Sequence, residues 1–134
     1  MESNSTNVLV VEDDANDSFM LIRQLEKAQI DDNATVVESG EKALDFLASA
    51  SRLPLAVFLD LRLPGSSGIE VLEKIRQDER LKDLPVVIMT GTTNPGDVGR
   101  CQSLGVTAFL EKPISLTSFI KTVAHLFPRA SAPE

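Results

Sequence analysis

Short, mostly unbroken apolar runs alternate along this chain with segments whose apolar residues recur every three or four positions. The runs cover residues 8–11, 34–37, 55–59, 86–89 and 106–110. Continuous apolar runs of this length are typical of strands that are buried on both faces of a sheet. Segments with helical spacing separate the runs and also follow the last of them. This order predicts an open, doubly wound α/β domain in which five helices flank a parallel sheet of five strands.

Sequence signals also mark the starts of the later helices. Ser67 and Glu70 match a capping box at the start of the third helix. Asn94 and Pro95 form a favourable N-cap and first position for the fourth. The fifth helix is predicted from one apolar stripe that should anchor it firmly. The stripe consists of Leu116, Phe119, Ile120, Val123 and Phe127.

Two glycines, Gly96 and Gly99, fall in the first turns of the fourth helix. An interior glycine costs about 1 kcal/mol relative to alanine, so this helix should be weaker than the fifth. We therefore expect the fourth helix and residues 91–94 to form a mobile element. The alternative is that both glycines only allow close packing against a neighbouring element.

The length and charge of the chain limit its possible roles. We expect its 134 residues to form one domain over residues 1–134, with a core at about 7–127 and a flexible tail at 128–134. The net charge of −7 argues against DNA as a partner, because DNA-binding proteins neutralise phosphates with Lys and Arg. No apolar run approaches the roughly 20 residues needed to span a membrane. Cys101 is the only cysteine, as expected in a reducing cytoplasm.

Polar side chains suited to one kind of chemistry follow four of the five predicted strands. Glu12 and Asp13 follow the first strand, Asp60 the third, Thr90 the fourth and Lys112 the fifth. A single acidic residue after a strand is most often a cap or a turn residue. In open parallel sheets, however, ligands bind at the carboxyl ends of the strands, near the switch in strand order. The four strand ends therefore predict one shared crevice.

These residue types fit phosphoryl chemistry with a metal ion. The carboxylates of Glu12, Asp13 and Asp60 would repel one another unless a cation lay between them. Mg²⁺ meets this need because it takes oxygen ligands and retains several waters. Thr90 and Lys112 are suited to bind phosphoryl oxygens, and phosphoryl transfer depends mainly on positioning and charge neutralisation. Asp60 is the candidate nucleophile because it should lie deepest and most central.

The chain resembles the receiver domains of bacterial two-component response regulators over about residues 8–127. The resemblance rests on four motifs, which are Glu12-Asp13, Asp60-Leu61-Arg62-Leu63-Pro64 with Gly68, Thr90-Gly91 and Lys112-Pro113. It implies a flavodoxin-like fold with strand order 2-1-3-4-5. It also implies that the protein accepts a phosphoryl group from a histidine kinase and catalyses only its own phosphorylation and dephosphorylation.

The same resemblance implies a Mg²⁺ site. Asp60, the phosphoacceptor, and Asp13 would bind the ion directly, together with the backbone carbonyl of Arg62. Glu12 would act largely through water. Asp14 is expected to start a helix rather than to bind the metal.

The resemblance further implies a switch. Thr90 and Lys112 would bind the phosphoryl oxygens, and Thr90 would move as Phe109 rotates. The Lys112–Pro113 peptide bond should be cis, an isomer that is readily accessible before proline.

Partners follow from two weaker similarities and from the end of the chain. Residues 37–47 and 81–85 are similar to single-domain regulators encoded with phytochrome-type kinases. After the fifth helix we expect no segment that binds DNA or catalyses a reaction. The output should therefore pass to an unknown downstream protein, or to a second copy, through the face made by the fourth helix, fifth strand and fifth helix.

Three other functions fit parts of the pattern. A phosphatase of the haloacid-dehalogenase type uses similar groups, but its nucleophile lies in the first motif and its acidic pair comes last. A flavin site would place a glycine- and hydroxyl-rich loop where Glu12, Asp13 and Asp14 would repel a phosphate. A pseudo-receiver that binds partners without phosphorylation is disfavoured by the complete set of site residues.

Overall fold

All five strands of the sheet are parallel, and their order in space differs from their order in the chain. The computed structural model describes residues 8–28, 34–63, 65, 67–91 and 94–126. Its strands are β1 (Val8–Val11), β2 (Ala34–Val37), β3 (Ala56–Asp60), β4 (Val86–Thr90) and β5 (Ala108–Glu111). The sheet order β2-β1-β3-β4-β5 confirms the predicted doubly wound, flavodoxin-like topology.

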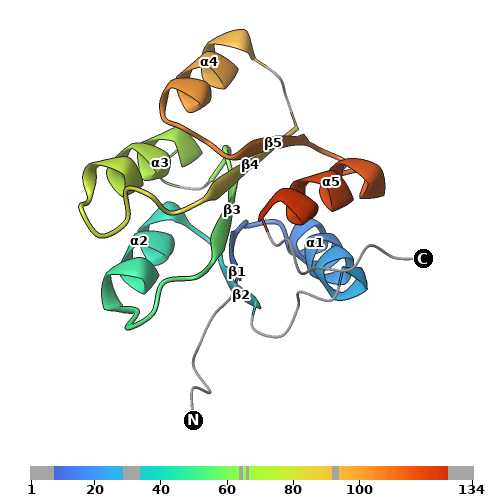
Figure 1. Cartoon of the computed structure of the whole chain (residues 1–134), viewed down its shortest axis with the longest axis horizontal. Helices are drawn as coiled ribbons and strands as arrows, with labels where there is room; N and C mark the ends of the chain where they lie inside the picture. Colours follow the sequence, from blue (N-terminus) through green and yellow to red (C-terminus); the bar gives the residue numbers. More distant parts are fainter. Residues whose placement is uncertain (1–7, 29–33, 64, 66, 92–93, 127–134) are drawn as a thin grey trace.

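Helices cover both faces of this sheet (Figure 1). One face carries α1 (Ala15–Lys27) and α5 (Leu116–Leu126), and the other carries α2 (Gly40–Ser49), α3 (Gly68–Gln77) and α4 (Pro95–Ser103). Successive strand residues point to opposite faces, so alternate residues of β1 enter the two apolar clusters of the core. None of the described helices is both long enough and apolar enough to cross a membrane.

The helix starts predicted for α3 and α4 are present. Ser67 Oγ accepts the backbone N–H of Glu70 at 3.2 Å, and Glu70 accepts that of Ser67 at 3.3 Å, which completes the capping box. Asn94 caps α4 by accepting the N–H of Gly96 at 2.8 Å, and Pro95 is the first helical residue. Local sequence therefore determines where these two helices begin.

The predicted bounds of β3 and β4 were wrong by one residue. Leu55 lies before β3 and is 56% exposed, because it precedes the part of the chain that pairs with β1. Both strands instead continue to the polar residue that follows the apolar run, Asp60 in β3 and Thr90 in β4. The two side chains are therefore held by regular strand backbone rather than by a loop.

The predicted start of β5 was wrong by two residues. Gly105 has a φ of +73°, which turns the chain at the end of α4. The N–H of Val106 then donates to the carbonyl oxygen of Cys101 at 3.3 Å, so this residue completes the end of the helix. The strand begins only at Ala108 and ends at Glu111, one residue later than predicted.

Burial differs from the prediction in β2 and α5. β2 lies at the edge of the sheet formed by the described strands, and its Val36 is 40% exposed. Within α5, Phe119 and Val123 are buried, but Leu116 is 40% exposed, so the stripe has fewer buried anchors than expected. Phe127 and the predicted tail at residues 128–134 lie outside the described residues.

Two kinds of glycine occur in the helices. A Cβ on Gly68, the first residue of α3, would lie 2.3 Å from the carbonyl oxygen of Asp60 and 2.7 Å from Cα of Leu61. A Cβ on Gly99 would meet no atom within 4 Å, and one on Gly96 would meet only the side-chain oxygen of Asn94. Close packing therefore explains Gly68 but neither glycine of α4.

Replacement of these glycines by alanine should have opposite effects on stability. Gly68→Ala should lower the free energy of unfolding by about 1–3 kcal/mol, because the backbone beneath the new methyl group cannot yield without moving α3 or Asp60. Gly99→Ala, the matched control, should raise it by about 0.5–1 kcal/mol, because alanine favours helix and finds open space. Urea unfolding measures both, and equal effects of the two substitutions would contradict the difference in packing between the two positions.

Candidate functional site

The carboxylates of Glu12, Asp13 and Asp60 gather where β1 and β3 end. Glu12 follows β1 and is 2% exposed, Asp60 ends β3 and is 4% exposed, and Asp13 is exposed beside them. One carboxylate oxygen from each of the three lies within 4.8 Å of the others. The parallel pairing of β1 with β3 explains this proximity, because it places the carboxyl ends of both strands side by side.

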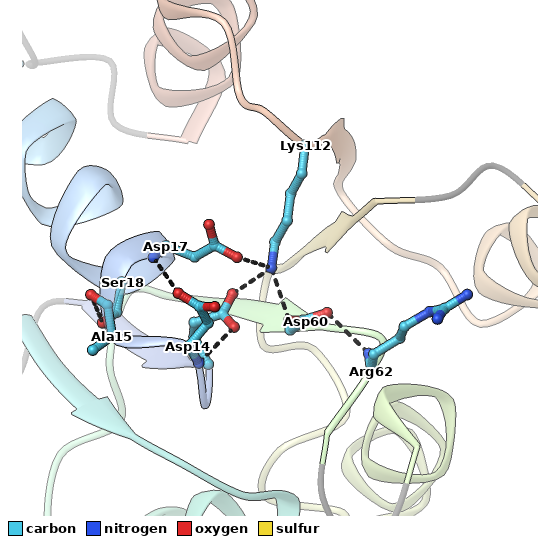
Figure 2. Close-up of polar contacts among 8 residues, drawn as sticks. Asp14, Ala15, Asp17, Ser18, Asp60, Arg62 and Lys112 are labelled. Carbon is cyan, nitrogen blue, oxygen red and sulfur yellow. Dashed lines mark hydrogen bonds and ion pairs between the residues drawn. The ribbon is translucent and has the colours of Figure 1, made fainter.

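The ammonium of Lys112 lies beside this cluster, and Figure 2 shows it next to Asp60 and Asp17. Its Nζ donates hydrogen bonds to Oε1 of Glu12 at 2.6 Å, to Oδ2 of Asp60 at 2.9 Å and to Oδ2 of Asp17 at 2.9 Å. Lys112 follows β5, and the peptide bond to Pro113 is cis, as predicted. One cation thus offsets part of the acidic charge through three charge-assisted hydrogen bonds.

Burial and charge shift the pKa values of two of these groups. Burial raises the pKa of Glu12 to about 7, because the loss of solvent disfavours the ionised carboxyl more than the Lys112 hydrogen bond favours it. Burial alone would lower the pKa of Lys112, but hydrogen bonds to Asp60, Glu12 and Asp17 outweigh this effect and raise it. Lys112 is therefore protonated at neutral pH, where Glu12 titrates.

Backbone groups hold Asp60 and its neighbours in place. Oδ1 of Asp60 accepts the backbone N–H of Arg62 at 2.9 Å, while Oδ2 faces Lys112. The Arg62 side chain is exposed and extends away from the carboxylates (Figure 2). Thr90 is 1% exposed at the end of β4, and its carbonyl oxygen accepts the N–H of Lys112 at 2.7 Å. Four of the predicted strand ends therefore meet at one edge of the sheet.

Phe109 and Asp14 lie outside this cluster. Phe109 is opposite Ile88 in the pairing of β4 with β5, and it packs half-buried against the apolar cluster on the α2, α3 and α4 face. Asp14 caps α1 by accepting the N–H of Asp17 at 3.0 Å, which agrees with the predicted helix-start role. The N–H of Asp14 also donates to Oε2 of Glu12 at 3.1 Å.

Sequence reasoning missed Asp17. This residue reaches Lys112 from the first turn of α1, one turn beyond Asp13. Asp13 precedes the cap of α1, so helical spacing does not relate it to Asp17, and the contact of Asp17 with Lys112 depends on how α1 docks on the sheet. Beside this contact is a cavity of about 100 Å³ between α1 and the segment after β5.

The arrangement has the donors required by a hard divalent cation. Carboxylate oxygens of Glu12, Asp13 and Asp60 converge on one point, and oxygen ligands are those that Mg²⁺, Mn²⁺ and Ca²⁺ prefer. The ammonium of Lys112 contacts two of these carboxylates, those of Glu12 and Asp60. The nearly buried Asp60 carboxylate therefore lies beside both a candidate metal position and a fixed positive charge.

The raised pKa of Glu12 predicts how stability depends on pH in metal-free solution. Between about pH 4.5 and 7 the folded protein retains a proton on Glu12 that the unfolded chain has released, so stability falls as pH rises through this window. Glu12→Gln should remove this fall in the free energy of unfolding, because glutamine does not titrate. Relative to the unmodified protein, the variant should gain about 1–3 kcal/mol between pH 4.5 and pH 8. Urea unfolding in EDTA at several pH values measures the difference.

The matched control for this prediction is Asp14→Asn, which removes an exposed carboxylate and retains a good N-cap for α1. Its stability should follow that of the unmodified protein across the same pH range. A Glu12→Gln profile parallel to that of the unmodified protein would contradict the assigned titration.

The sequence matches known signalling proteins over nearly its whole length. The family described as response regulator receiver domain matches residues 8–124. Response regulator Rcp1 of Synechocystis sp. is 36% identical over 128 residues, which cover 91% of this chain and 87% of that protein. The probable methanogenesis regulatory protein FilR2 of Methanothrix harundinacea is 35% identical over 123 residues, 89% of this chain and 79% of that protein.

Solved structures agree with this family. The bacteriophytochrome response regulator RtBRR superposes with a TM-score of 0.80 at 32% identity, covering 95% of this chain and 82% of that one. The Mn²⁺-bound form of Rcp1 has a TM-score of 0.80 at 30% identity and covers 97% and 100%. The phosphorylated cyanobacterial phytochrome response regulator RcpA has a TM-score of 0.80 at 28% identity, with the same coverage. Sequence, fold and the acidic site together show that this chain belongs to the response regulator receiver domains of two-component signalling.

Proposed function

We propose that this protein is a single-domain response regulator in which Asp60 accepts a phosphoryl group from a histidine kinase while Mg²⁺ is bound beside it. One observation carries the proposal. The carboxylate of Asp60 is nearly buried, shares a cluster with Glu12 and Asp13, and accepts a hydrogen bond from the Lys112 ammonium. A carboxylate beside both a metal site and a fixed cation has the surroundings that phosphoryl transfer requires.

Residues of the acidic cluster would hold the metal ion. Asp13 and Asp60 would bind it directly, Glu12 would act through water, and the backbone carbonyl of Arg62 would complete the protein ligands. The three convergent carboxylates support this assignment, and so does the Mn²⁺-bound form of the relative Rcp1. When bound, Mg²⁺ would neutralise charge on the phosphoryl group as it transfers.

Residues of this chain would position the phosphoryl group. A carboxylate oxygen of Asp60 forms the new bond to phosphorus as the bond from phosphorus to the histidine nitrogen of the kinase breaks. Lys112 exchanges its hydrogen bond to Asp60 for one to a phosphoryl oxygen, and the Thr90 hydroxyl binds another. The phosphorylated structure of the relative RcpA supports a phosphoryl group in this family.

The same event would change a binding surface. Thr90 moves toward the phosphoryl group, Phe109 rotates, and α4 shifts with them. The weak attachment of α4 supports this part of the proposal, because Cys101 is its single buried residue and Gly99 lies in open space. Residues 92–93 of the predicted mobile loop lie outside the described residues. The face formed by α4, β5 and α5 would then bind a downstream protein or a second copy.

The partner and location follow from the relatives and the composition. A phytochrome-like histidine kinase is the proposed phosphodonor, since RtBRR and AtBRR are bacteriophytochrome response regulators. The proposed activity is limited to the protein's own phosphorylation and dephosphorylation. A cytoplasmic location is supported by the single thiol of Cys101, which is buried in the core.

Phosphorylation by a small donor tests the proposed acceptor. With Mg²⁺ and acetyl phosphate, the protein should gain one base-labile phosphoryl group, and EDTA should prevent the gain. Asp60→Asn should abolish it without loss of the fold, because the substitution is nearly isosteric. Asp45→Asn, which changes an exposed carboxylate on α2, should be modified like the unmodified protein. Intact-mass spectrometry reads the result, and full phosphorylation of Asp60→Asn would exclude the assignment.

A further inference from the structure

The Lys112 ammonium donates hydrogen bonds to three carboxylates, and a bound metal ion would engage only some of them. Glu12 and Asp60 belong to the carboxylate cluster that would hold the ion. Asp17, the third acceptor, is not part of that cluster and approaches Lys112 from α1. A metal ion would therefore compete with Lys112 for the carboxylates of Glu12 and Asp60. The carboxylate of Asp17 would remain available to Lys112.

Asp17 is well placed to hold Lys112 because its own position is fixed. Its backbone N–H donates to Oδ1 of Asp14 at 3.0 Å in the first turn of α1, and that helix is anchored by the buried Leu21. Gln24, further along α1, donates to the carbonyl oxygen of Ile114 at 3.1 Å, which ties the helix to the segment that follows Lys112. Helix and lysine therefore keep their relative placement.

We infer that Asp17 is a positioning residue for phosphorylation, which holds the Lys112 ammonium beside Asp60 when the metal ion engages Glu12 and Asp60. This inference rests on the proposed function of the site. A lysine side chain has four rotatable bonds and loses much rotamer freedom when its ammonium is fixed. If Asp17 remains bonded to Lys112, the lysine side chain is already ordered, and its conformational entropy is already lost, before the phosphoryl group arrives.

The cavity next to this contact gives Lys112 space to leave Asp60. It is lined by Asp17 and Lys112 together with Glu12, and it lies between α1 and the segment after β5. In the absence of the Asp17 carboxylate, the ammonium can turn toward this space and toward solvent. Fewer molecules would then present it to the incoming phosphoryl oxygens, so transfer would be slower.

A purely structural role for Asp17 predicts different behaviour. Its carboxylate makes no described contact that holds the helix together, since Asp14 supplies the cap. A role through charge alone also differs, because loss of a negative charge near an anionic donor should accelerate transfer. A positioning role, a structural role and a charge effect of Asp17 can therefore be distinguished. The comparison uses alanine and asparagine at position 17 and a control substitution at a neighbouring residue.

Four full-length proteins provide the test, which are the unmodified chain, Asp17→Ala, Asp17→Asn and Asp14→Asn. Each is mixed with acetyl phosphate at saturating Mg²⁺, and quenched samples are read by intact-mass spectrometry to give the second-order rate constant. Asp17→Ala should lower the rate constant about two- to five-fold, the range expected for loss of a half-exposed ion pair. Asp17→Asn should restore at least half of it, because the amide oxygen still accepts from Lys112. Asp14→Asn should react like the unmodified chain.

Several results would overturn the inference. They are an Asp17→Ala rate equal to or above that of the unmodified chain, an Asp17→Asn rate no better than that of alanine, and an equal loss in Asp14→Asn. Thermal unfolding of each variant shows whether it is folded. If Asp17→Ala is unstable, the rate constant of Asp17→Asn is compared with those of the unmodified chain and Asp14→Asn. An unmodified chain that takes up no phosphoryl group would overturn the proposed function itself, and this inference with it.

Discussion

The contact of the Lys112 ammonium with three carboxylates is the interaction on which the rest of the site depends. It joins the end of β1, the end of β3 and the first turn of α1 through Glu12, Asp60 and Asp17. Carboxylates that are buried together are costly to ionise unless a cation offsets their charge. Lys112 supplies that cation in the metal-free fold, and the proposed Mg²⁺ would supply it in the bound state. The same charged groups, the clustered carboxylates and Lys112, therefore affect both the stability of the fold and the proposed function.

The proposed movement of α4 is supported by a difference between the contacts at its two ends. The guanidinium of Arg76 on α3 donates to the carbonyl oxygens of Leu104 at 2.6 Å and Gly105 at 2.9 Å, where α4 ends. An ion pair between Glu73 and Arg100 also ties α4 to α3. The last turn of α4 is thus fixed, whereas its first turn, near Thr90, has no comparable contacts among the described residues. Such a helix is suited to pivot about its end.

Much of this structure could be predicted from sequence, and the exceptions have physical causes. Apolar runs predicted the five strands of a parallel sheet, and the convergence of parallel strand ends brought Asp60 and Lys112 together as expected. The start of β5 was not predictable from apolar residues, because Val106 serves the end of α4. Asp17 was missed because a helical side chain reaches a distant lysine only through the docking of the whole helix. Side-chain contacts between separate elements are set by packing, which local patterns do not contain.

A crystal structure with Mg²⁺ and beryllofluoride, a phosphoryl mimic, tests the central claim most directly. We predict beryllofluoride on Asp60, with Lys112 and Thr90 each in contact with a fluoride and Mg²⁺ bound by Asp13 and Asp60. Beryllofluoride on another carboxylate, or an adduct on Asp60 with Lys112 still bonded to that carboxylate and no metal beside it, would contradict the claim.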